Sequence, residues 1–532
     1  MRVLVTEVLG ESGMAFLQEH TSVDVRTKLS HEELCAILPD YDALIVRSAT
    51  KVNASLLESG KRLRVVARAG TGVDNIDVDA ATRLGILVVN APAGNSNAVA
   101  EHTIALILAL ARQLVPAADS LKAGRWEKNR LQGIEVRNKT LGLVGLGRIG
   151  RMVAAKAKGL EMRVVAFDPF VSPGGAASIG VELLTMDEVL QTADFISVHT
   201  PLTPATRGLI GERELAMIKP EAYLINAARG GLIDEKALRE ALDAGRLAGA
   251  ALDVFEVEPV QDQALLAHEN LVATPHLGGS TAEAQENIAL EVARAVVDYL
   301  EGRFPPNPVN VPYVAPQEAE AMQPYIDLAD RLGSFFIQWR TRISGPLELV
   351  FEGEVCEYDT RVLTAAFLAG LLRDATAEPV NIVNARHVAS QAGLEVSEMA
   401  LQRPDRTEGQ ITARMVNGPE PRDISGVLVN GKPHLAGLDG QRLDCVAQGH
   451  MIVDVHHDVP GIVGNLGQLL GSNGVNISFA QMGRARRGGE AIMILGIDDT
   501  PPADIIPQIL ELPHIRRAQV VELASLPGYD EL

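Results

Sequence analysis

The chain has 532 residues, is 47% hydrophobic and carries a formal net charge of −20. This length allows three or four domains, each with a core of its own. The negative charge argues against nucleic acid or an anionic membrane as the main partner, because both require a basic face. The three cysteines are far apart and odd in number, which predicts neither a disulfide framework nor a metal site.

The start of the sequence does not have the pattern of a targeting segment. The first residues, MRVLVTEVLG, run directly into an apolar strand and lack the long apolar stretch and cleavage site of a signal peptide. The most apolar helical stretch, residues 104–111, is flanked by charged residues and is too short to span a bilayer. We therefore expect a cytoplasmic protein without a membrane partner.

Residues 1–95 alternate short apolar strands with helical stretches, which is typical of a small α/β domain with a parallel sheet. Strands are expected at residues 3–6, 23–25, 43–46, 65–67 and 87–89, and helices near residues 13–20 and 32–38. An apolar helix over residues 96–114 follows, and its composition predicts burial between domains or subunits. Within it, Glu101 and His102 are candidate catalytic residues, but a helix cap or interdomain hydrogen bonds explain the pair better.

A glycine-rich turn follows this helix. Residues 141–151, LGLVGLGRIGR, read as a buried strand, then Gly145, Gly147 and Gly150, then an apolar-periodic helix. This is the strand, turn and helix of a dinucleotide fingerprint, in which the helix N-terminus binds the pyrophosphate. A second strand ends at Asp168, where a carboxylate would accept hydrogen bonds from the ribose hydroxyls and repel a 2′-phosphate. The combination predicts an NAD site rather than an NADP site, and an ordinary glycine turn explains it poorly.

Beyond this turn, four apolar runs end in polar residues. Their ends are HTP (199–201), NAARGG (226–231), DV (253–254) and TPH (274–276). The carboxyl ends of parallel strands share one edge of a doubly wound sheet, where such sheets bind their ligands. A long helix from about residue 283 leads back toward the first domain, and a proline-rich stretch at 305–308 marks a boundary.

These features divide the chain into four predicted domains. The first is a substrate-binding domain of residues 1–95 and 285–312, and the second is an NAD-binding domain of residues 96–284. Both are predicted to be α/β domains with a Rossmann-like, doubly wound sheet. Residues 317–447 read as an α+β domain with no catalytic constellation, with helices at 326–339 and 361–372 and strands at 347–352 and 426–429. Residues 449–527 follow a β-α-β-β-α-β order, which is ferredoxin-like.

Three residues at the predicted sheet edge suit the oxidation of a 2-hydroxy acid by NAD. Arg229 can hold a carboxylate in bidentate fashion and polarise a carbonyl. His276 can accept the hydroxyl proton, because histidine titrates near neutral pH, and Glu258 can orient its imidazole. Taken singly, each residue has a structural explanation as a loop anchor, a turn residue or a cap. Their common edge downstream of the NAD fingerprint favours the catalytic interpretation.

At these residues the sequence resembles the D-isomer-specific 2-hydroxyacid dehydrogenase family, and within it the long members that end in an ACT-like module. The motifs are RAGTGVDNID (68–77), GLGRIGR (145–151), INAARGG (225–231), ALDVFEVEP (251–259) and TPHLGGST (274–281). The resemblance implies that Arg229, Glu258 and His276 are catalytic and that Asp253 holds the nicotinamide carboxamide. It also implies an NAD site formed by Thr71, Gly145, Gly147, Arg148, Ile149, Gly150, Asp168, Thr200, Ala227, Ala228, Arg229, Asp253, His276, Gly278 and Gly279.

The same resemblance implies the reaction, which is NAD-dependent oxidation of 3-phospho-D-glycerate to 3-phosphooxypyruvate, the first step of L-serine biosynthesis. It assigns the phosphate of this substrate to Arg47 and Arg68, each at or near the end of a strand in the first domain. Lys128 is a further match that would reach the site of a neighbouring subunit. Without the resemblance these residues would be interpreted as solvated basic side chains.

The C-terminal domains are expected to regulate the enzyme. Residues 317–447 resemble the intervening domain of the long members, most clearly at VNIVNARHVASQAG (380–393). The ACT-like module would bind an amino acid, with L-serine as the possible effector, between two copies of the chain in a homotetramer. His456, Asp458 and Asn476 match the serine ligands, although Asp458 stands where some members carry Asn. Capping of a turn and a helix explains these three residues nearly as well.

Two other functions fit parts of the sequence. Another D-2-hydroxyacid dehydrogenase, or a reductase of glyoxylate, hydroxypyruvate or 2-oxoglutarate, would share the catalytic residues but would not need a phosphate on its substrate. An NAD-sensing regulatory protein would explain the C-terminal sensor module. The complete Arg–Glu–His set and the lack of a basic or disordered partner-binding segment count against the regulatory protein.

Overall fold

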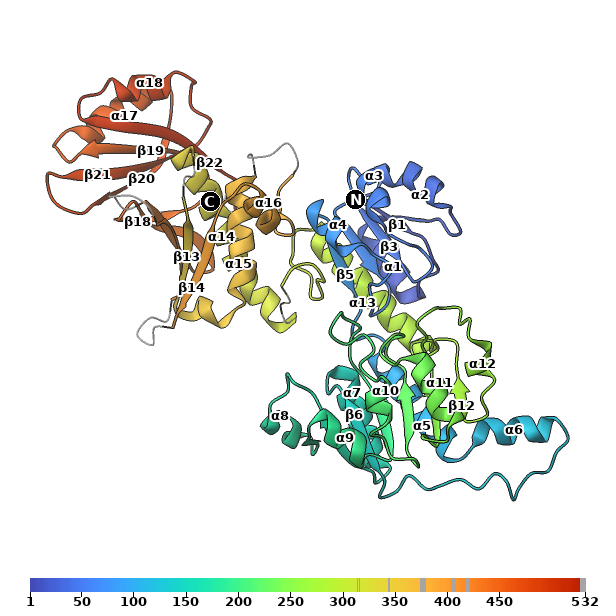
Figure 1. Ribbon diagram of the computed structural model, residues 1–532. Helices are drawn as coiled ribbons and strands as arrows, with labels where there is room; N and C mark the ends of the chain where they lie inside the picture. Colours follow the sequence, from blue (N-terminus) through green and yellow to red (C-terminus); the bar gives the residue numbers. More distant parts are fainter. Residues whose placement is uncertain are drawn as a thin grey trace. The chain divides into compact units, whose positions relative to one another are not determined.

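The computed structural model describes residues 1–312, 314, 316–342, 345–373, 379–402, 408–416 and 422–526 of the chain. It contains two compact units (Figure 1). Unit 1 comprises Met1–Val8, Ala15–Asn90 and Val292–Leu532, and unit 2 comprises Leu9–Met14 and Ala91–Glu291. The last residue of the predicted ACT-like domain, 527, lies outside the described residues.

The first sheet, in unit 1, is parallel and has the strand order β2-β1-β3-β4-β5. Its strands are β1 (Arg2–Val5), β2 (Ser22–Val25), β3 (Ala43–Val46), β4 (Val65–Arg68) and β5 (Leu87–Asn90). The helices between them are α1 (Glu11–His20), α2 (His31–Ile37), α3 (Ala54–Ser59) and α4 (Val78–Arg83). Side-chain caps fix the helix starts, because Ser30, Asn53 and Asp77 each accept a backbone N–H that the helix leaves unpaired. The predicted strands and the two predicted helices are confirmed.

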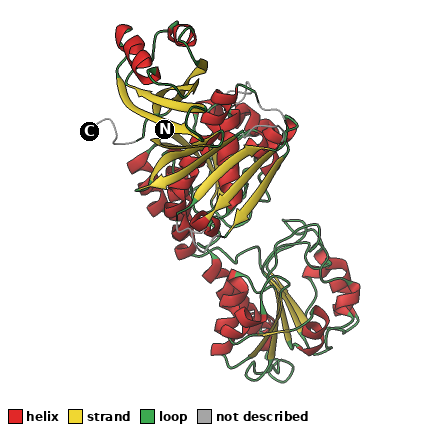
Figure 2. Cartoon of the chain, turned by 90° about the vertical axis from the view of Figure 1, so that its left-hand side faces the viewer, coloured by secondary structure: helices red, strands yellow, loops and turns green. Residues whose placement is uncertain are grey.

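The second sheet, in unit 2, is also parallel and has the order β12-β11-β10-β9-β6-β7-β8. Its strands are β6 (Thr140–Val144), β7 (Arg163–Phe167), β8 (Glu182–Leu183), β9 (Phe195–Val198), β10 (Tyr223–Asn226), β11 (Gly249–Leu252) and β12 (Leu271–Ala273). The strand order reverses between β6 and β9, which creates the crevice where doubly wound sheets bind nucleotides. Helices line both faces of this sheet (Figure 2).

The helices of this second sheet are α5 (Ser96–Ala111), α6 (Leu114–Lys122), α7 (Arg148–Gly159), α8 (Pro173–Ser178), α9 (Met186–Thr192), α10 (Glu212–Leu215), α11 (Glu235–Asp243) and α12 (Gln263–Leu266). The apolar helix α5 packs against α7, β10 and β11 inside unit 2. Much of this helix is buried in the core of unit 2, as its composition predicts, while its expected contacts between domains or subunits stay a prediction. The long helix α13 (Ala282–Leu300) begins in unit 2 and ends in unit 1, as its place in the sequence predicts.

The third sheet is mixed, with the order β14-β13-β15-β16-β17-β18, and β14 is its parallel strand. Its strands are β13 (Leu347–Glu352), β14 (Val396–Leu401), β15 (Gln410–Met415), β16 (Asp423–Val429), β17 (Lys432–Leu438) and β18 (Gln441–Val446). It is accompanied by helices α14 (Pro316–Arg340), α15 (Thr360–Leu372) and α16 (Ala385–Gln391). Gly333 and Gly370 let α14 and α15 approach closely, since a Cβ at either position would lie 2.0 Å from a carbonyl oxygen of the other helix.

The fourth sheet is antiparallel, with the order β20-β21-β19-β22. Its elements are β19 (Gly449–His457), α17 (Ile462–Ser472), β20 (Ile477–Arg484), β21 (Glu490–Ile497), α18 (Ile505–Leu510) and β22 (Ile515–Leu523). Ile452 and Leu495 from the sheet pack with Leu466 and Ile509 from the two helices to form its core. The predicted ferredoxin-like β-α-β-β-α-β order is confirmed.

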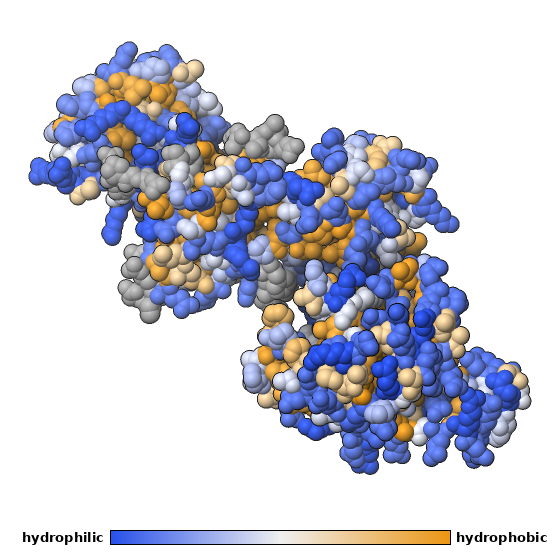
Figure 3. Space-filling model, in the orientation of Figure 1, coloured by the Kyte–Doolittle hydropathy of each residue, from blue (hydrophilic) through white to orange (hydrophobic). Residues whose placement is uncertain are grey.

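Polar and charged side chains cover much of the visible face (Figure 3), in keeping with the charge of the chain. Apolar side chains are exposed on and after α6, where Leu121 is 60% and Trp126 82% exposed. Within the described residues, no helix by itself has the length and apolar composition to cross a membrane, and only the bent pair of α5 and α6 meets both criteria together.

Candidate active site

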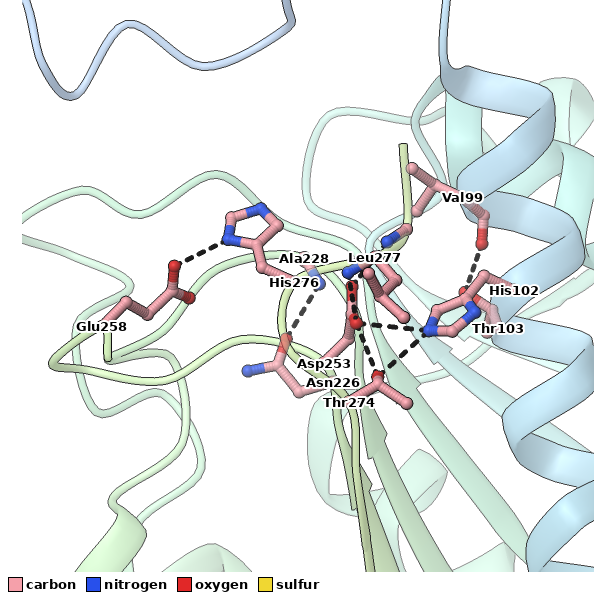
Figure 4. A network of polar contacts seen from close by, with 11 residues as sticks. Val99, His102, Thr103, Asn226, Ala228, Asp253, Glu258, Thr274, His276 and Leu277 are labelled. Atoms are coloured by element: carbon pink, nitrogen blue, oxygen red, sulfur yellow. Dashed lines mark hydrogen bonds and ion pairs between the residues drawn. The ribbon is translucent and has the colours of Figure 1, made fainter. Parts of the chain in front are cut away.

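The three candidate catalytic residues follow three neighbouring strands of the second sheet. Arg229 comes after β10, Glu258 after β11 and His276 after β12, and β11 pairs with both of the other strands. Because the strands are parallel, all three residues lie at the carboxyl edge, as the sequence predicts. Figure 4 shows Glu258 and His276 facing each other at this edge.

His276 and Glu258 form a close pair at this edge. The Nδ1 atom of His276 lies 2.8 Å from Oε2 of Glu258. A carboxylate accepts hydrogen bonds and cannot donate them, so Nδ1 carries a proton, and in the neutral imidazole Nε2 keeps its lone pair. The side chains are 52% and 39% exposed, which leaves the imidazole accessible to a substrate. The pair is therefore arranged for general base catalysis at Nε2.

Local backbone contacts hold the carboxylate of Glu258. Its Oε1 accepts the backbone N–H of Phe255 at 3.1 Å, which leaves Oε2 directed at His276. The peptide bond between Glu258 and Pro259 is cis. The two oxygens of one carboxylate thus link the loop after β11 to the turn after β12.

Asp253 is buried beneath the turn that carries His276. Its Oδ1 accepts the hydroxyl of Thr274 at 2.6 Å and the N–H of Leu277 at 2.7 Å, and its Oδ2 accepts the N–H of Gly278 at 2.8 Å. Burial opposes ionisation of Asp253, but hydrogen bonds from His102, Thr274 and the two amides hold its pKa below the ordinary value. The carboxylate therefore works as an anchor for the turn, and its predicted contact with the nicotinamide carboxamide stays a prediction.

Arg229 lies in a turn that Asn226 organises. The side-chain amide of Asn226 donates to the carbonyl of Arg229 at 2.8 Å, and its oxygen accepts the N–H of Ala228 at 3.0 Å. The next residue must be glycine, since a Cβ at Gly230 would lie 1.8 Å from the carbonyl oxygen of Phe255. The loops that carry Arg229 and Glu258 are thereby packed backbone to backbone.

The glycine turn after β6 has the conformation that a bound dinucleotide needs. Gly145 has φ 102°, and a Cβ on it would lie 2.5 Å from the carbonyl oxygen of His199. No atom lies within 4 Å of the Cβ position of Gly147, which opens α7 at its N-terminus, so the space for a phosphate is clear. The hydroxyl of Thr200 is buried without a hydrogen-bond partner beside this turn. These features fit NAD.

Asp168 stands at the end of the second strand of the fingerprint, as predicted. Its Oδ2 accepts the N–H of Leu146 within the glycine turn at 2.8 Å, and its Oδ1 accepts the N–H of Phe170 at 2.9 Å. Asp168 thus supports the glycine turn itself. Each carboxylate oxygen has a second lone pair for a ribose hydroxyl.

The other predicted NAD residues fall into two groups. Those of unit 2 lie in segments that leave the carboxyl edge of the second sheet or begin α7: Arg148, Ile149, Gly150, Ala227, Ala228, Gly278 and Gly279. Thr71 belongs to unit 1, where the side chain of Asn90 donates to its carbonyl.

Two of the predicted phosphate ligands share an edge of the first sheet. Arg47 directly follows β3, Arg68 ends β4, and these two strands pair in parallel. Glu7 accepts the N–H of Arg47 at 2.9 Å, and the guanidinium of Arg68 occupies the space where Gly70 would carry a Cβ. The structure thus brings both arginines to one carboxyl edge, within unit 1.

Lys128 belongs to unit 2, whereas Arg47 and Arg68 belong to unit 1. It is exposed in the segment after α6, two residues before Arg130. The guanidinium of Arg130 forms an ion pair of 2.6 Å with Glu269, which precedes β12. This segment therefore lies at the amino edge of the second sheet, opposite the edge that carries His276.

The predicted effector residues do not gather around one site within the chain. His456 is 1% exposed in β19 and pairs with Asp454 at 2.6 Å. Asp458 accepts the N–H of Gly488 and the guanidinium of Arg484, which lower its pKa. Asn476 is bonded to the carboxylate of Asp498 at 2.6 Å and is exposed.

Several residues of the site are not singled out by the sequence. Asn226 and Thr274 lie inside motifs, but their roles depend on the path of the backbone. Thr274 and His102 are 172 positions apart, yet Nε2 of His102 lies 3.2 Å from the Thr274 hydroxyl. Both residues belong to unit 2, so this hydrogen bond is not the interdomain contact that was one of the expectations for His102.

Comparisons with known proteins agree with this geometry. Residues 104–278 match the NAD binding domain of the D-isomer specific 2-hydroxyacid dehydrogenases, residues 321–438 the D-3-phosphoglycerate dehydrogenase intervening domain, and residues 450–514 the ACT domain. The D-3-phosphoglycerate dehydrogenase of Methanocaldococcus jannaschii is 41% identical, over 98% of this chain and 100% of the relative. A chloroplastic D-3-phosphoglycerate dehydrogenase of Arabidopsis thaliana is 40% identical, over 98% of this chain and 92% of the relative, so the compartment varies among relatives.

Among solved structures, a glyoxylate reductase from Paecilomyes thermophila is 30% identical with a TM-score of 0.54. The structural match covers 98% of that protein but 58% of this chain. The relatives that match over the full length have the intervening and ACT regions as well. This chain therefore belongs to the D-3-phosphoglycerate dehydrogenases, NAD-binding enzymes of the D-isomer specific 2-hydroxyacid dehydrogenase family.

Proposed function

We propose that this chain oxidises 3-phospho-D-glycerate to 3-phosphooxypyruvate with NAD, the first step of L-serine biosynthesis. The observation that carries the proposal is the pair of His276 and Glu258, 2.8 Å apart at the same carboxyl edge of the sheet as the dinucleotide turn. The full-length similarity to D-3-phosphoglycerate dehydrogenases supports the choice of substrate.

The residues divide the chemistry between them. Nε2 of His276 accepts the proton of the C2 hydroxyl as the carbonyl forms, and Glu258 stabilises the resulting imidazolium. Arg229 binds the substrate carboxylate through charge-assisted hydrogen bonds. NAD, when bound, accepts the hydride that leaves C2. Proton and hydride together account for the two hydrogens that the alcohol loses.

Arg47 and Arg68 bind the phosphate of the substrate. Guanidinium groups suit phosphate because their planar donors match its oxygens, and adjacent strand ends supply two of them at one edge. In a chain of net charge −20, local arginines are needed to attract a dianionic group.

The test is the initial rate of NADH formation with 3-phospho-D-glycerate against D-glycerate. We expect kcat/KM to favour the phosphorylated substrate by about 10²-fold or more, since each charge-assisted hydrogen bond contributes roughly 1.5–3 kcal/mol. Arg47→Ala should reduce this preference. Arg62→Ala is the matched control, because Arg62 precedes β4 and pairs with Asp42 instead. Equal rates on both substrates would leave a D-2-hydroxyacid dehydrogenase without phosphate specificity.

The regulatory part of the proposal is feedback by L-serine at the ACT domain of a homotetramer. The apolar side chains exposed on and after α6, including Leu121 and Trp126, support contacts between copies. The mass in solution, measured by light scattering, tests the tetramer.

L-serine should lower the rate of NADH formation in the wild type and less so in Asn476→Ala, whereas no effect of L-serine would leave the enzyme unregulated by it.

A further inference from the structure

His102, on helix α5, contacts residues that support the turn carrying His276. Nε2 of His102 lies 3.2 Å from the hydroxyl of Thr274 and 3.2 Å from Oδ1 of Asp253 (Figure 4). The side chain is 21% exposed, and Asp253 beneath it is 1% exposed. His102 therefore closes one side of the polar network that underlies His276.

The proton positions in this network follow from its chemistry. The carboxylate of Asp253 can only accept, so the hydroxyl of Thr274 gives its single proton to Oδ1 over 2.6 Å. The hydroxyl and the carboxylate then both offer acceptors to His102. Nε2 of His102 must consequently carry a proton, and it donates into the network.

Asp253 transmits this contact to the turn that holds His276. Its side chain accepts the N–H groups of Leu277 and Gly278, and its own carbonyl accepts the N–H of His276 at 2.8 Å. His276 itself has φ 54°, a left-handed conformation that is uncommon for a residue with a side chain. Rotation of the Asp253 carboxylate would therefore shift the two amides that follow His276.

We propose that His102 is a positioning residue that acts through Asp253 on the catalytic His276. Its N–H fixes the rotation of the carboxylate, and the carboxylate fixes the turn. The inference rests on the proposed function, because it concerns the base of that reaction. A small displacement of a catalytic group is enough to lower turnover by about 10²-fold.

The test uses three variants of the full chain. His102→Phe keeps an aromatic ring but removes the donor, and His102→Gln restores an N–H at a similar distance from the backbone. Glu101→Gln is the matched control, because Glu101 is the neighbour of His102 on α5 and, among the described residues, bonds to Asn97 and Lys156 at the surface and not to the network of Asp253. The measurements are kcat and KM for NAD-dependent oxidation of 3-phospho-D-glycerate, and hydrogen exchange of the peptide over residues 274–280.

We expect His102→Phe to lower kcat by about 10- to 100-fold with KM within roughly threefold, and to speed exchange in that peptide about tenfold. His102→Gln should recover most of the kcat, and Glu101→Gln should match the wild type. Wild-type kcat and exchange in His102→Phe, or equal losses in the Phe and Gln variants, would overturn the positioning role. If the wild type does not oxidise 3-phospho-D-glycerate, the proposed function fails, while the exchange of the turn still decides the role of His102.

Discussion

Glu258→Gln gives a sharp prediction, because the structure fixes which way the new amide must face. In the wild type, Oε1 of Glu258 accepts the N–H of Phe255 and Oε2 faces Nδ1 of His276. An amide nitrogen cannot accept from Phe255, so the carbonyl oxygen of Gln stays there and the NH2 group faces the imidazole. The variant keeps its shape, but a donor replaces the acceptor beside His276.

The consequence is the wrong tautomer of the catalytic base. A donor at Nδ1 favours the form with the proton on Nε2, and that nitrogen then has no lone pair for the substrate proton. General base catalysis contributes about 10²–10⁴-fold, so kcat should fall by about that factor, or roughly 3–5 kcal/mol of barrier. KM for both substrates should change little, because Glu258 binds neither of them in this account.

The assay is steady-state NADH formation at several pH values, with the melting temperature measured to confirm folding. Glu256→Gln is the control, because Glu256 lies two residues away and its carboxylate pairs with Arg207 instead. A Glu258→Gln kcat within about threefold of the wild type would refute the reasoning from the tautomer of His276.

Three further variants test other parts of the account. Gly230→Ala should destabilise the protein by about 1–3 kcal/mol or more, measured by denaturant unfolding, because the new Cβ would lie 1.8 Å from the carbonyl oxygen of Phe255; unchanged stability would contradict the close approach of the two loops. Arg229→Lys should raise KM for the substrate by about 10- to 100-fold and leave NAD binding within roughly threefold, in kinetic and calorimetric measurements, because lysine cannot bind a carboxylate in bidentate fashion. Burial lowers the pKa of His199 to about 4, below its ordinary 6.5. Between these two pH values the folded protein therefore binds fewer protons than the unfolded chain. The free energy of unfolding is then highest, as far as His199 is concerned, above pH 6.5, and it falls by about 1.4 kcal/mol per pH unit on acidification toward pH 4. The melting temperature of the wild type should accordingly drop more than that of His199→Gln from about pH 7.5 to about pH 5, and equal drops would show that this histidine is not held neutral.

The parts of the fold that the sequence predicts well are those whose local pattern and final environment agree. Strands such as β3 and β10 are short apolar runs between turns, and the parallel sheets bury them on both faces. In the third sheet the sequence predicts β13 and part of β16 but not β14, because this edge strand is largely exposed and shows no alternation. The apolar composition of α5 predicts that the helix is buried. Composition alone does not say which surfaces cover it.

The candidate site divides in the same way. Arg229, Glu258 and His276 could be predicted because each follows a strand, and the edge of a parallel sheet collects such residues. The role of Asp253 as an anchor could not, since it depends on amides more than 20 residues further along the chain. The role of His102 could not be predicted either, because its partner Thr274 is 172 residues away and comes into contact only when α5 packs on the sheet.

The most direct test of the central claim is the turnover of His276→Ala with 3-phospho-D-glycerate and NAD, beside the wild type. If Nε2 of His276 accepts the hydroxyl proton, kcat should fall by about 10²–10⁴-fold while calorimetry gives an NAD affinity within roughly threefold of the wild type. A His276→Ala variant that turns over like the wild type would contradict the claim that this histidine is the base.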